Sequence, residues 1–257
     1  MKTCLYDASL QVRSVHSIVQ FLNALTSARR CKLLFSFFRN RARRKHPILH
    51  LEGTGARQLK TLVHVGAHLA QERTLYERMG FGDILWIEGS PDIYQRLAES
   101  FSGTAANSVA RHRTLCALLS EESGRDVSFY QFNNEGASNS LFPATQRLHD
   151  RWPHVQQTAE VQQLTTLTLD EAVASQGLAG SVNVLVVDVQ GAELLVLKGG
   201  IRTLSEVDAV VCEVSTEPFY DGGVLYPELK SFLNANGFNP SMEPPKAHCD
   251  LLFRRAA

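Results

Sequence analysis

The sequence predicts an α/β domain with a mostly parallel central sheet. From about residue 59 onward, short apolar runs alternate with stretches of helical periodicity, which is typical of parallel strands joined by helices. Several of the apolar runs end in an acidic residue, and such sheets bind ligands beyond the carboxyl ends of their strands. The 257-residue length and the 44% hydrophobic and 20% charged composition suit one globular domain with an extension.

The first part of this domain contains three expected strands and two expected helices. The runs at 59–66 and 83–91 are apolar enough for buried strands, and the run at 111–120 supplies a third. A helical pattern covers 70–80, and a second helix begins near Pro91, where proline suits the first turn. Strand and helix therefore alternate twice before the third strand.

The second part continues the alternation after a less regular stretch. Residues 126–132 alternate like an exposed strand, whereas 133–164 are polar and show no firm periodicity. The residues Leu194, Leu197, Ile201 and Leu204 recur at helical spacing and predict one face of a helix. The remaining expected elements are, in chain order, a segment at 166–175 that leads into a strand over 182–187, a strand over 208–215, a helix over 226–238 and a strand over 249–255.

Residues 1–58 form a basic extension, which we expect to be partly helical, ahead of the domain at 59–257. They contain 11 Lys and Arg against two Asp and Glu, although the formal net charge of the whole chain is zero. The basic residues concentrate in 29–46, where leucines and phenylalanines interrupt them. This stretch is either a basic helix that packs its apolar side against the domain or a segment that lies on an anionic membrane. Nucleic-acid binding is disfavoured, because the rest of the chain is acidic and would repel phosphate.

The cysteines and the hydropathy pattern predict a cytoplasmic protein, peripheral to a membrane if the basic stretch contacts lipid. The five cysteines are scattered and form no CxxC pair, which favours reduced thiols over a disulfide framework or a zinc site. No apolar run reaches the roughly 20 residues that span a bilayer, and the N-terminus lacks the pattern of a secretory signal. The histidines show no metal-binding spacing, and no GxSxG motif indicates a serine hydrolase.

Two consecutive strand ends carry residues suited to a cofactor that contains adenosine. Gly66 follows the first strand and allows a ligand to approach closely, and Glu88 ends the second, where an acid can accept both ribose hydroxyls. His68 stands where the dinucleotide fingerprint GxGxxG requires its second glycine, which argues against a nicotinamide dinucleotide. Taken singly, Gly66 could be an ordinary strand-to-helix turn and Glu88 a surface acid.

The stretch NVLVVDVQGAELLVLKGG, residues 183–200, brings a carboxylate to the end of a buried strand. Asp188 ends this apolar run and Glu213 ends a later one, so both are expected at the same edge of the sheet. A carboxylate there can hold a cofactor's ammonium group, bind a divalent cation or take a proton from a hydroxyl. Helix capping is the alternative for Asp188, and it is the better interpretation for Glu193 in the first turn of the next helix.

The motifs taken in chain order resemble those of a known family. HVGAHLAQE, WIEGSP, SNSLFP, TLTLDEA, VDVQGAELLVLKGG and CEVS are similar to motifs of the FkbM-type methyltransferases, which use S-adenosylmethionine. The resemblance covers about residues 60–255. It implies a class I methyltransferase fold, which is a Rossmann-like, seven-stranded, mostly parallel sheet with helices on both faces and one antiparallel strand near the C-terminal edge. Members are typically O-methyltransferases that act on sugars of glycans or on hydroxyls of natural products.

The resemblance also implies roles for residues at the strand ends. The implied cofactor-binding residues are Gly66, Ala67 and His68 for the amino-acid part, Glu88 for the ribose, Cys116 and Ala117 for the adenine, and Asp188 for the ammonium group or the acceptor. The chain departs from the family at His64, where an acid is frequent, and at His68, where asparagine is frequent.

Methyl transfer to a hydroxyl would gain ~10²–10⁴-fold from a nearby base. Asp188 is the first candidate for this base, and Glu213 is the alternative. A divalent cation between the two is chemically feasible, but their spacing does not indicate one. The polar segment 133–165 is either an acceptor-binding lid or a disordered insertion. In a lid, the acceptor-binding candidates are Asn134, Ser138, Asn139 and Ser140.

We therefore expect an S-adenosylmethionine-dependent O-methyltransferase that acts on a sugar hydroxyl of a glycan or glycolipid. Two alternatives stay open. One is a nicotinamide-dependent oxidoreductase built on a similar sheet, and the other is a non-catalytic member that keeps the fold for binding.

Overall fold

The computed structural model describes residues 46–51, 60–102 and 110–256. The chain divides into two compact units, Met1–His46 and Pro47–Ala257, and the account below concerns the second. Residues 1–45, and with them almost all of the basic stretch, lie outside the described residues, so membrane contact stays a prediction. Within the described ranges, every helix is too short or too polar to cross a bilayer.

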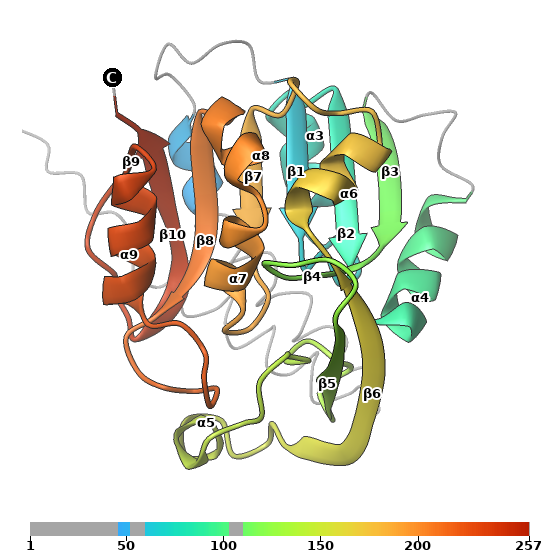
Figure 1. Cartoon of the computed structure of the whole chain (residues 1–257), viewed down its shortest axis with the longest axis vertical. Coiled ribbons are helices and arrows are strands. Elements are labelled where there is room, and N and C mark those ends of the chain that lie inside the picture. Colours follow the sequence, from blue (N-terminus) through green and yellow to red (C-terminus); the bar gives the residue numbers. More distant parts are fainter. Residues whose placement is uncertain (1–45, 52–59, 103–109, 257) are drawn as a thin grey trace, which may run out of the picture. The chain divides into compact units, whose positions relative to one another are not determined.

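A seven-stranded sheet forms the centre of the second unit, in the order β3-β2-β1-β7-β8-β10-β9 (Figure 1). The strands that run parallel to one another are β1 (Thr61–Val65), β2 (Asp83–Glu88), β3 (Arg111–Cys116), β7 (Val184–Val187) and β8 (Ala209–Ser215). Strand β10 (His248–Arg255) pairs antiparallel with β8 and with the edge strand β9 (Phe238–Pro240). This confirms the predicted mostly parallel sheet with one antiparallel strand near its C-terminal edge.

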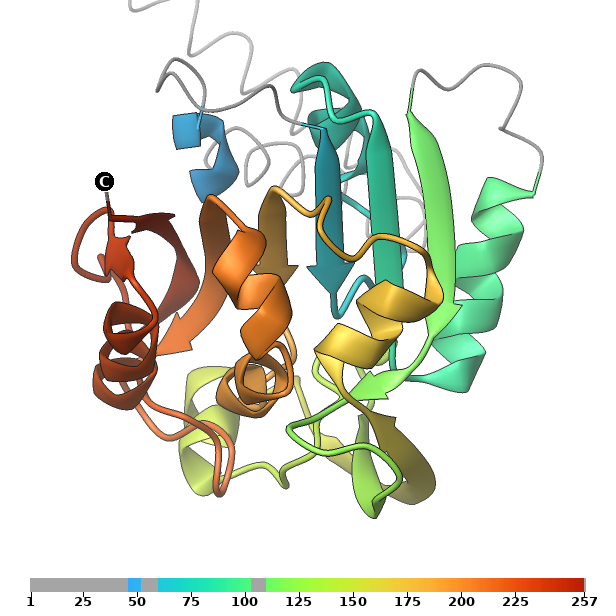
Figure 2. The same ribbon diagram turned by 45° about the horizontal axis from the view of Figure 1, so that its top comes forward.

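Helices cover both faces of this sheet (Figures 1 and 2). The helices on one face are α6 (Leu169–Ser175), α7 (Glu193–Lys198), α8 (Ile201–Glu206) and α9 (Tyr226–Ala235). Those on the other face are η1 (Pro47–Leu51), α3 (Arg73–Arg78) and α4 (Pro91–Phe101). Successive strand residues point to opposite faces, so Leu62 packs in one core and Val63 in the other. Because η1 packs in the second core, residues before 59 also contribute to the packing on the sheet.

A smaller sheet stands beyond the carboxyl ends of the parallel strands, with the order β4-β6-β5 (Figure 1). It consists of β4 (Leu118–Leu119), β5 (Asp126–Phe132) and β6 (Gln157–Leu167), and α5 (Gln146–Arg151) lies between β5 and β6 in the chain. Of the two interpretations of the polar segment 133–165, the disordered insertion is therefore wrong, and the acceptor-binding lid stays a prediction. Strand β6 is polar and mostly exposed, so it lacks the hydrophobic pattern by which a strand is recognised.

The single helix face predicted after β7 is split into α7 and α8 at two glycines. A Cβ on Gly199 would overlap the carbonyl oxygen of Ser120, and a Cβ on Gly200 would lie 2.5 Å from the Leu169 side chain. The predicted single helix is therefore wrong, and Ile201, at the start of α8, is 47% exposed whereas the other three residues of the predicted face are buried.

Candidate functional site

The chain turns sharply after β1, at Gly66. This residue has a φ of +79°, in the left-handed region that favours glycine, and a Cβ there would overlap the carbonyl oxygen of Asp188. The N–H groups of Gly66 and Ala67 both donate to the carbonyl oxygen of Ile87, at 3.0 Å. The turn therefore lies between the end of β2, to which it is hydrogen-bonded, and the end of β7, against which it packs.

Glu88 ends β2, and its carboxylate is fixed beside this turn. The residue is 7% exposed, and its Oε2 and Oε1 accept the N–H groups of His68 and Ser90, each at 2.8 Å. Burial raises the pKa of Glu88, and the backbone hydrogen bonds oppose the rise. Each oxygen keeps a further lone pair, so the carboxylate can still accept two ligand hydroxyls.

The end of β3 completes this part of the edge. Cys116 is the partner of Glu88 in the parallel register, and the N–H of Ala117 donates to the Glu88 carbonyl oxygen at 3.0 Å. Cys116 is an exposed free thiol. The residues predicted to bind the cofactor, from Gly66 to Ala117, thus lie together at the adjacent ends of β1, β2 and β3.

His68 joins the β1 turn to the segment that follows β5. Its φ is +46°, its Nδ1 lies 2.6 Å from the Gln71 side-chain nitrogen, and its Nε2 lies 3.0 Å from the carbonyl oxygen of Glu135. The position where a dinucleotide site needs glycine therefore carries an imidazole that contacts the polar segment.

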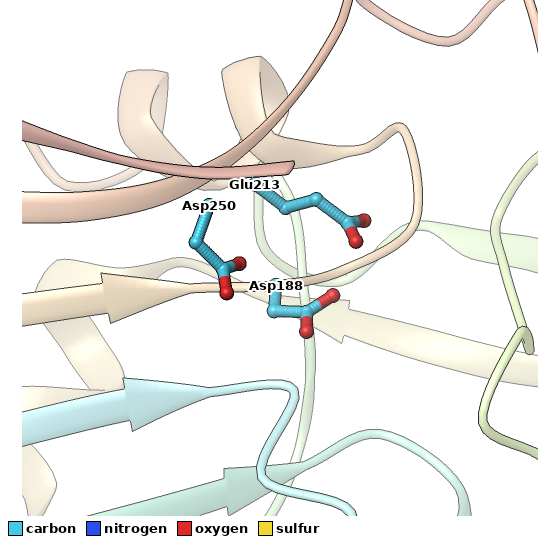
Figure 3. A group of neighbouring side chains, drawn as sticks. All are labelled: Asp188, Glu213 and Asp250. Atoms are coloured by element: carbon cyan, nitrogen blue, oxygen red, sulfur yellow. The ribbon is translucent and has the colours of Figure 1, made fainter. Parts of the chain in front are cut away.

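Three carboxylates from β7, β8 and β10 gather farther along the same edge (Figure 3). Asp188 directly follows β7, Glu213 lies in β8, and Asp250 is opposite Glu213 in the register of β10. One oxygen from each lies within 4.8 Å of the others. No lysine or arginine in the described part of the chain forms an ion pair with any of them. We call these three residues the acidic cluster; carboxylates so placed can attract a cation or accept a proton.

Gln190 holds two members of the acidic cluster together. Its side-chain nitrogen donates to Asp188 Oδ1 at 2.7 Å and to Glu213 Oε2 at 2.8 Å. Its side-chain oxygen accepts the Tyr220 hydroxyl at 2.6 Å. With a φ of +55°, the Gln190 backbone is in the left-handed region, which places this amide between the two carboxylates.

His248 contacts Glu213 from β10. Its Nε2 lies 2.8 Å from Glu213 Oε1, and its Nδ1 lies 2.8 Å from the Ser215 hydroxyl. The ring also packs edge-on against Trp152 and Phe219, at centroid distances of 5.3 and 5.4 Å. Burial lowers the pKa of His248, and the nearby carboxylates oppose this. A neutral ring that donates from Nε2 to Glu213 and accepts from Ser215 at Nδ1 satisfies both contacts.

The pKa values of Asp188 and Glu213 are both raised well above the usual carboxyl range. Burial is the largest cause for each, and Asp250 raises both further by like-charge repulsion. The hydrogen bonds from Gln190 lower both pKa values in part. Asp188 and Glu213 therefore bind a proton more readily than ordinary carboxylates, as a catalytic base requires.

Glu193 has a structural role, although it holds the loop before α7 and does not cap the helix, which has no side-chain cap. The residue is 3% exposed, and its Oε1 accepts the N–H groups of Val189 and Gly191 at 3.1 and 3.0 Å. It fixes the loop that carries Gln190.

A cavity of about 240 Å³ opens beside the acidic cluster. Its wall combines the apolar side chains of Leu148, Trp152 and Val155 with the polar side chains of Asn134, Ser138, Gln190, Tyr220 and His248. Gln190 and His248 therefore belong both to the wall of this cavity and to the hydrogen-bond network of the cluster.

The four residues predicted to bind an acceptor fall into two pairs. Asn134 and Ser138 line the cavity. Asn139 accepts the N–H of Phe132 at 2.8 Å, and the buried Ser140 hydroxyl donates to the carbonyl oxygen of Gln190 at 2.7 Å, so this second pair holds the segment in place.

Sequence reasoning did not single out Gln190, Tyr220, Trp152, Ser215 or Asp250, and it noted His248 only for its lack of metal-binding spacing. The alternation of His248, Asp250 and Leu252 along one strand could have revealed His248 and Asp250. Because β10 runs antiparallel, its first residues lie at the same edge as the carboxyl ends of its neighbours. Tyr220 and Trp152 come from loops, where no periodicity indicates a site.

Three solved structures illustrate what the chain is similar to. The FkbM methyltransferase of Methylobacillus flagellatus KT has a TM-score of 0.48 and 14% identity, over 78% of this chain and 45% of that chain. The magnesium protoporphyrin IX methyltransferase of Synechocystis PCC 6803 has a TM-score of 0.46 and 10% identity, over 99% and 100%. A SAM-dependent methyltransferase of Aquifex aeolicus has a TM-score of 0.45 and 10% identity, over 82% and 89%. A comparison with curated proteins finds no match.

The seven-stranded sheet with helices on both faces is the class I methyltransferase, Rossmann-like fold that the resemblance implies. The family model described as the methyltransferase FkbM domain matches residues 64–240, which is more than half of the 257-residue chain. The matched range includes the β1 turn, Glu88, Asp188 and Glu213. The chain therefore belongs to the FkbM methyltransferase family.

Proposed function

We propose that the protein is an S-adenosylmethionine-dependent O-methyltransferase whose acceptor is a sugar hydroxyl of a glycan or glycolipid. Membership of the FkbM family supports methyl transfer. The observation that carries the proposal is the acidic cluster, which has no lysine or arginine partner among the described residues and touches the β1 turn through Gly66 and Asp188. One edge of the sheet would thereby provide both a binding site for a cationic methyl donor and a base for the acceptor hydroxyl.

The residues at the strand ends fit this cofactor. Glu88 can accept the two ribose hydroxyls, because each of its oxygens has a lone pair beyond the backbone bond that it already makes. The negative charge of the acidic cluster complements the positive sulfonium and ammonium groups. The tight turn at Gly66 leaves no side chain between these two regions.

S-adenosylmethionine held by Glu88 and the β1 turn would supply an electrophilic methyl group, and the acceptor hydroxyl would give its proton to a base of the chain. The chain's part is to align the acceptor, which is worth up to ~7–11 kcal/mol, and to receive the proton. The backbone of Asp188 lies against the β1 turn at Gly66, where the methyl donor would bind. This position favours Asp188 as the base and leaves Glu213, whose two oxygens contact His248 and Gln190, as the alternative.

The proposal requires no divalent cation. The amide nitrogen of Gln190 already bridges Asp188 and Glu213, where a cation shared by these two carboxylates would lie. The amide supplies two hydrogen bonds in place of a metal ion's charge.

Calorimetric titration of S-adenosylmethionine into the full chain tests the proposal. We expect saturable binding that Glu88→Ala weakens about 10- to 100-fold, the loss for hydrogen bonds to a charged group. Glu99→Ala, at an exposed position of α4, should bind like the wild type. Absence of binding by the folded wild-type chain would contradict the proposal and favour a non-catalytic role. Transfer of labelled methyl groups to a panel of glycosides then identifies the acceptor.

A further inference from the structure

The cavity beside the acidic cluster has a wall without formal charge. None of the described residues that line it is Lys, Arg, Asp or Glu, and burial favours the neutral form of His248. A phosphate or a carboxylate bound there would lose water and find no ion-pair partner among these lining residues. The volume of about 240 Å³ corresponds to on the order of eight water molecules, so the cavity suits one small ring.

Asn134 brings to this wall a buried acceptor that has no donor. Its side-chain nitrogen donates to the Ser138 hydroxyl at 2.8 Å, but its Oδ1 is buried without a hydrogen-bond partner among the described residues. An unsatisfied buried acceptor of this kind costs about 1–3 kcal/mol. This oxygen is buried although Asn134 lines the cavity, so the Asn134 amide has to turn before a hydroxyl of a bound molecule can donate to it and remove the penalty.

Trp152 adds an aromatic ring that its neighbours hold in place, with the Arg151 guanidinium over the ring at 5.5 Å from its centroid. Its ring packs against Phe219 and His248 at centroid distances of 4.9 and 5.3 Å. A pyranose has C–H groups on its faces and hydroxyls around its edge. An aromatic ring surrounded by hydrogen-bonding side chains, here those of Asn134, Ser138 and Tyr220, complements both features.

Because Gln190 and His248 bound the cavity and also contact Glu213, a ring in the cavity lies next to the acidic cluster. We propose that the cavity binds a single neutral sugar ring of the acceptor, with one face on Trp152 and a hydroxyl that donates to Asn134 Oδ1. Another hydroxyl of the same ring then faces the carboxylates. This inference rests on the proposed function and adds how the acceptor is recognised, which is through one uncharged ring.

Tryptophan fluorescence can test this, because the chain has only two tryptophans and Trp86 is fully buried in the core. We would titrate the full chain, saturated with S-adenosylhomocysteine, with methyl glycosides of neutral hexoses, deoxyhexoses and pentoses. At least one should change the emission saturably, and Trp152→Phe should abolish the change. Asn134→Ala should weaken binding about 2- to 10-fold. Asn239→Ala, at an exposed position of β9, should not.

Three results would overturn the inference. They are no response to any neutral glycoside, a response to phenol, glucosamine or a sugar phosphate alone, and a response that Asn134→Ala leaves unchanged. Calorimetry with S-adenosylhomocysteine distinguishes failure of this inference from failure of the proposed function. If the cofactor product binds and no neutral sugar does, the cavity assignment fails alone. If neutral sugars bind in the absence of S-adenosylhomocysteine, and S-adenosylhomocysteine itself does not bind, the cofactor proposal fails alone.

Discussion

Glu88 ends β2 and Asp188 directly follows β7, so both lie at the same edge of the sheet. Their carboxylates nevertheless have different surroundings. Both oxygens of Glu88 accept backbone N–H groups, so the carboxylate is held by donors that do not move independently of the fold. Asp188 accepts a bond from the side-chain amide of Gln190 and lies beside two further carboxylates. Burial raises the pKa of both residues, but only Asp188 also has neighbouring carboxylates that raise it further.

The difference separates a carboxylate suited to binding from one suited to proton transfer. Backbone donors stabilise the charged form of Glu88 in one orientation, as recognition of two hydroxyls requires. Repulsion within the acidic cluster destabilises the charged form of Asp188, so the carboxylate gains from taking up a proton. Residues of one chemical type can therefore have different roles at one edge of the same sheet, because their hydrogen-bond donors and charged neighbours differ.

Asp188→Asn removes the carboxylate that is suited to proton transfer, and the loss of activity is the largest effect that we expect. The amide keeps the shape of the side chain but accepts a proton far less readily, so methyl transfer to the identified acceptor should fall ~10²–10⁴-fold. Binding of S-adenosylmethionine, measured by calorimetry, should change much less than kcat. Asp221→Asn, in an exposed loop, is the control and should keep wild-type activity. An Asp188→Asn enzyme with near-normal kcat would assign the base to Glu213 or remove the need for one.

The second effect tests the contact that joins the two regions. Gly66→Ala places a Cβ on the Asp188 carbonyl oxygen at a positive φ, and should lower the free energy of unfolding by about 3 kcal/mol or more. Gly80→Ala has a similar positive φ of +87° but meets nothing within 4 Å, so it should cost about 1–2 kcal/mol. Denaturant unfolding measures both. Equal losses would show that the overlap at Gly66 relaxes without cost.

The sequence could predict those parts of the site that lie on strands with a plain hydrophobic pattern. Asp188 ends a run of buried valines and leucine, and Glu88 ends a strand of five buried residues, so each stands out against an apolar background. The alternation of strand and helix likewise predicts which edge of the sheet carries the site. In these elements one strong local signal determines the structure.

The rest depends on contacts between segments that are distant in sequence. Trp152 and Tyr220 reach the cavity from loops 68 residues apart, and β6 pairs through its backbone although its side chains are polar and exposed. The helix break before Ile201 follows from the close approach of Ser120 to Gly199, which no pattern within the helix encodes. Local periodicity carries no information about such long-range packing.

The smallest effect concerns the pH dependence of stability, and its sign follows from the raised pKa of Asp188. In the unfolded chain this carboxyl titrates near its usual value of about 4, so above that pH the folded protein holds more protons than the unfolded one. The free energy of unfolding therefore falls as pH rises through the raised pKa, and the contribution is fully present only below the usual value.

Asp188→Asn removes this titration together with one of three repelling charges. It should therefore unfold at the same or a lower temperature than the wild type near pH 4, and be more stable by about 0.5–2 kcal/mol near pH 8. Calorimetric melting at several pH values measures the difference between the two proteins, in which the other titrating groups largely cancel. The curve for Asp221→Asn should stay parallel to that of the wild type. If the Asp188→Asn curve were also parallel, the acidic cluster would not strain the folded state, and its contrast with Glu88 would be one of position alone.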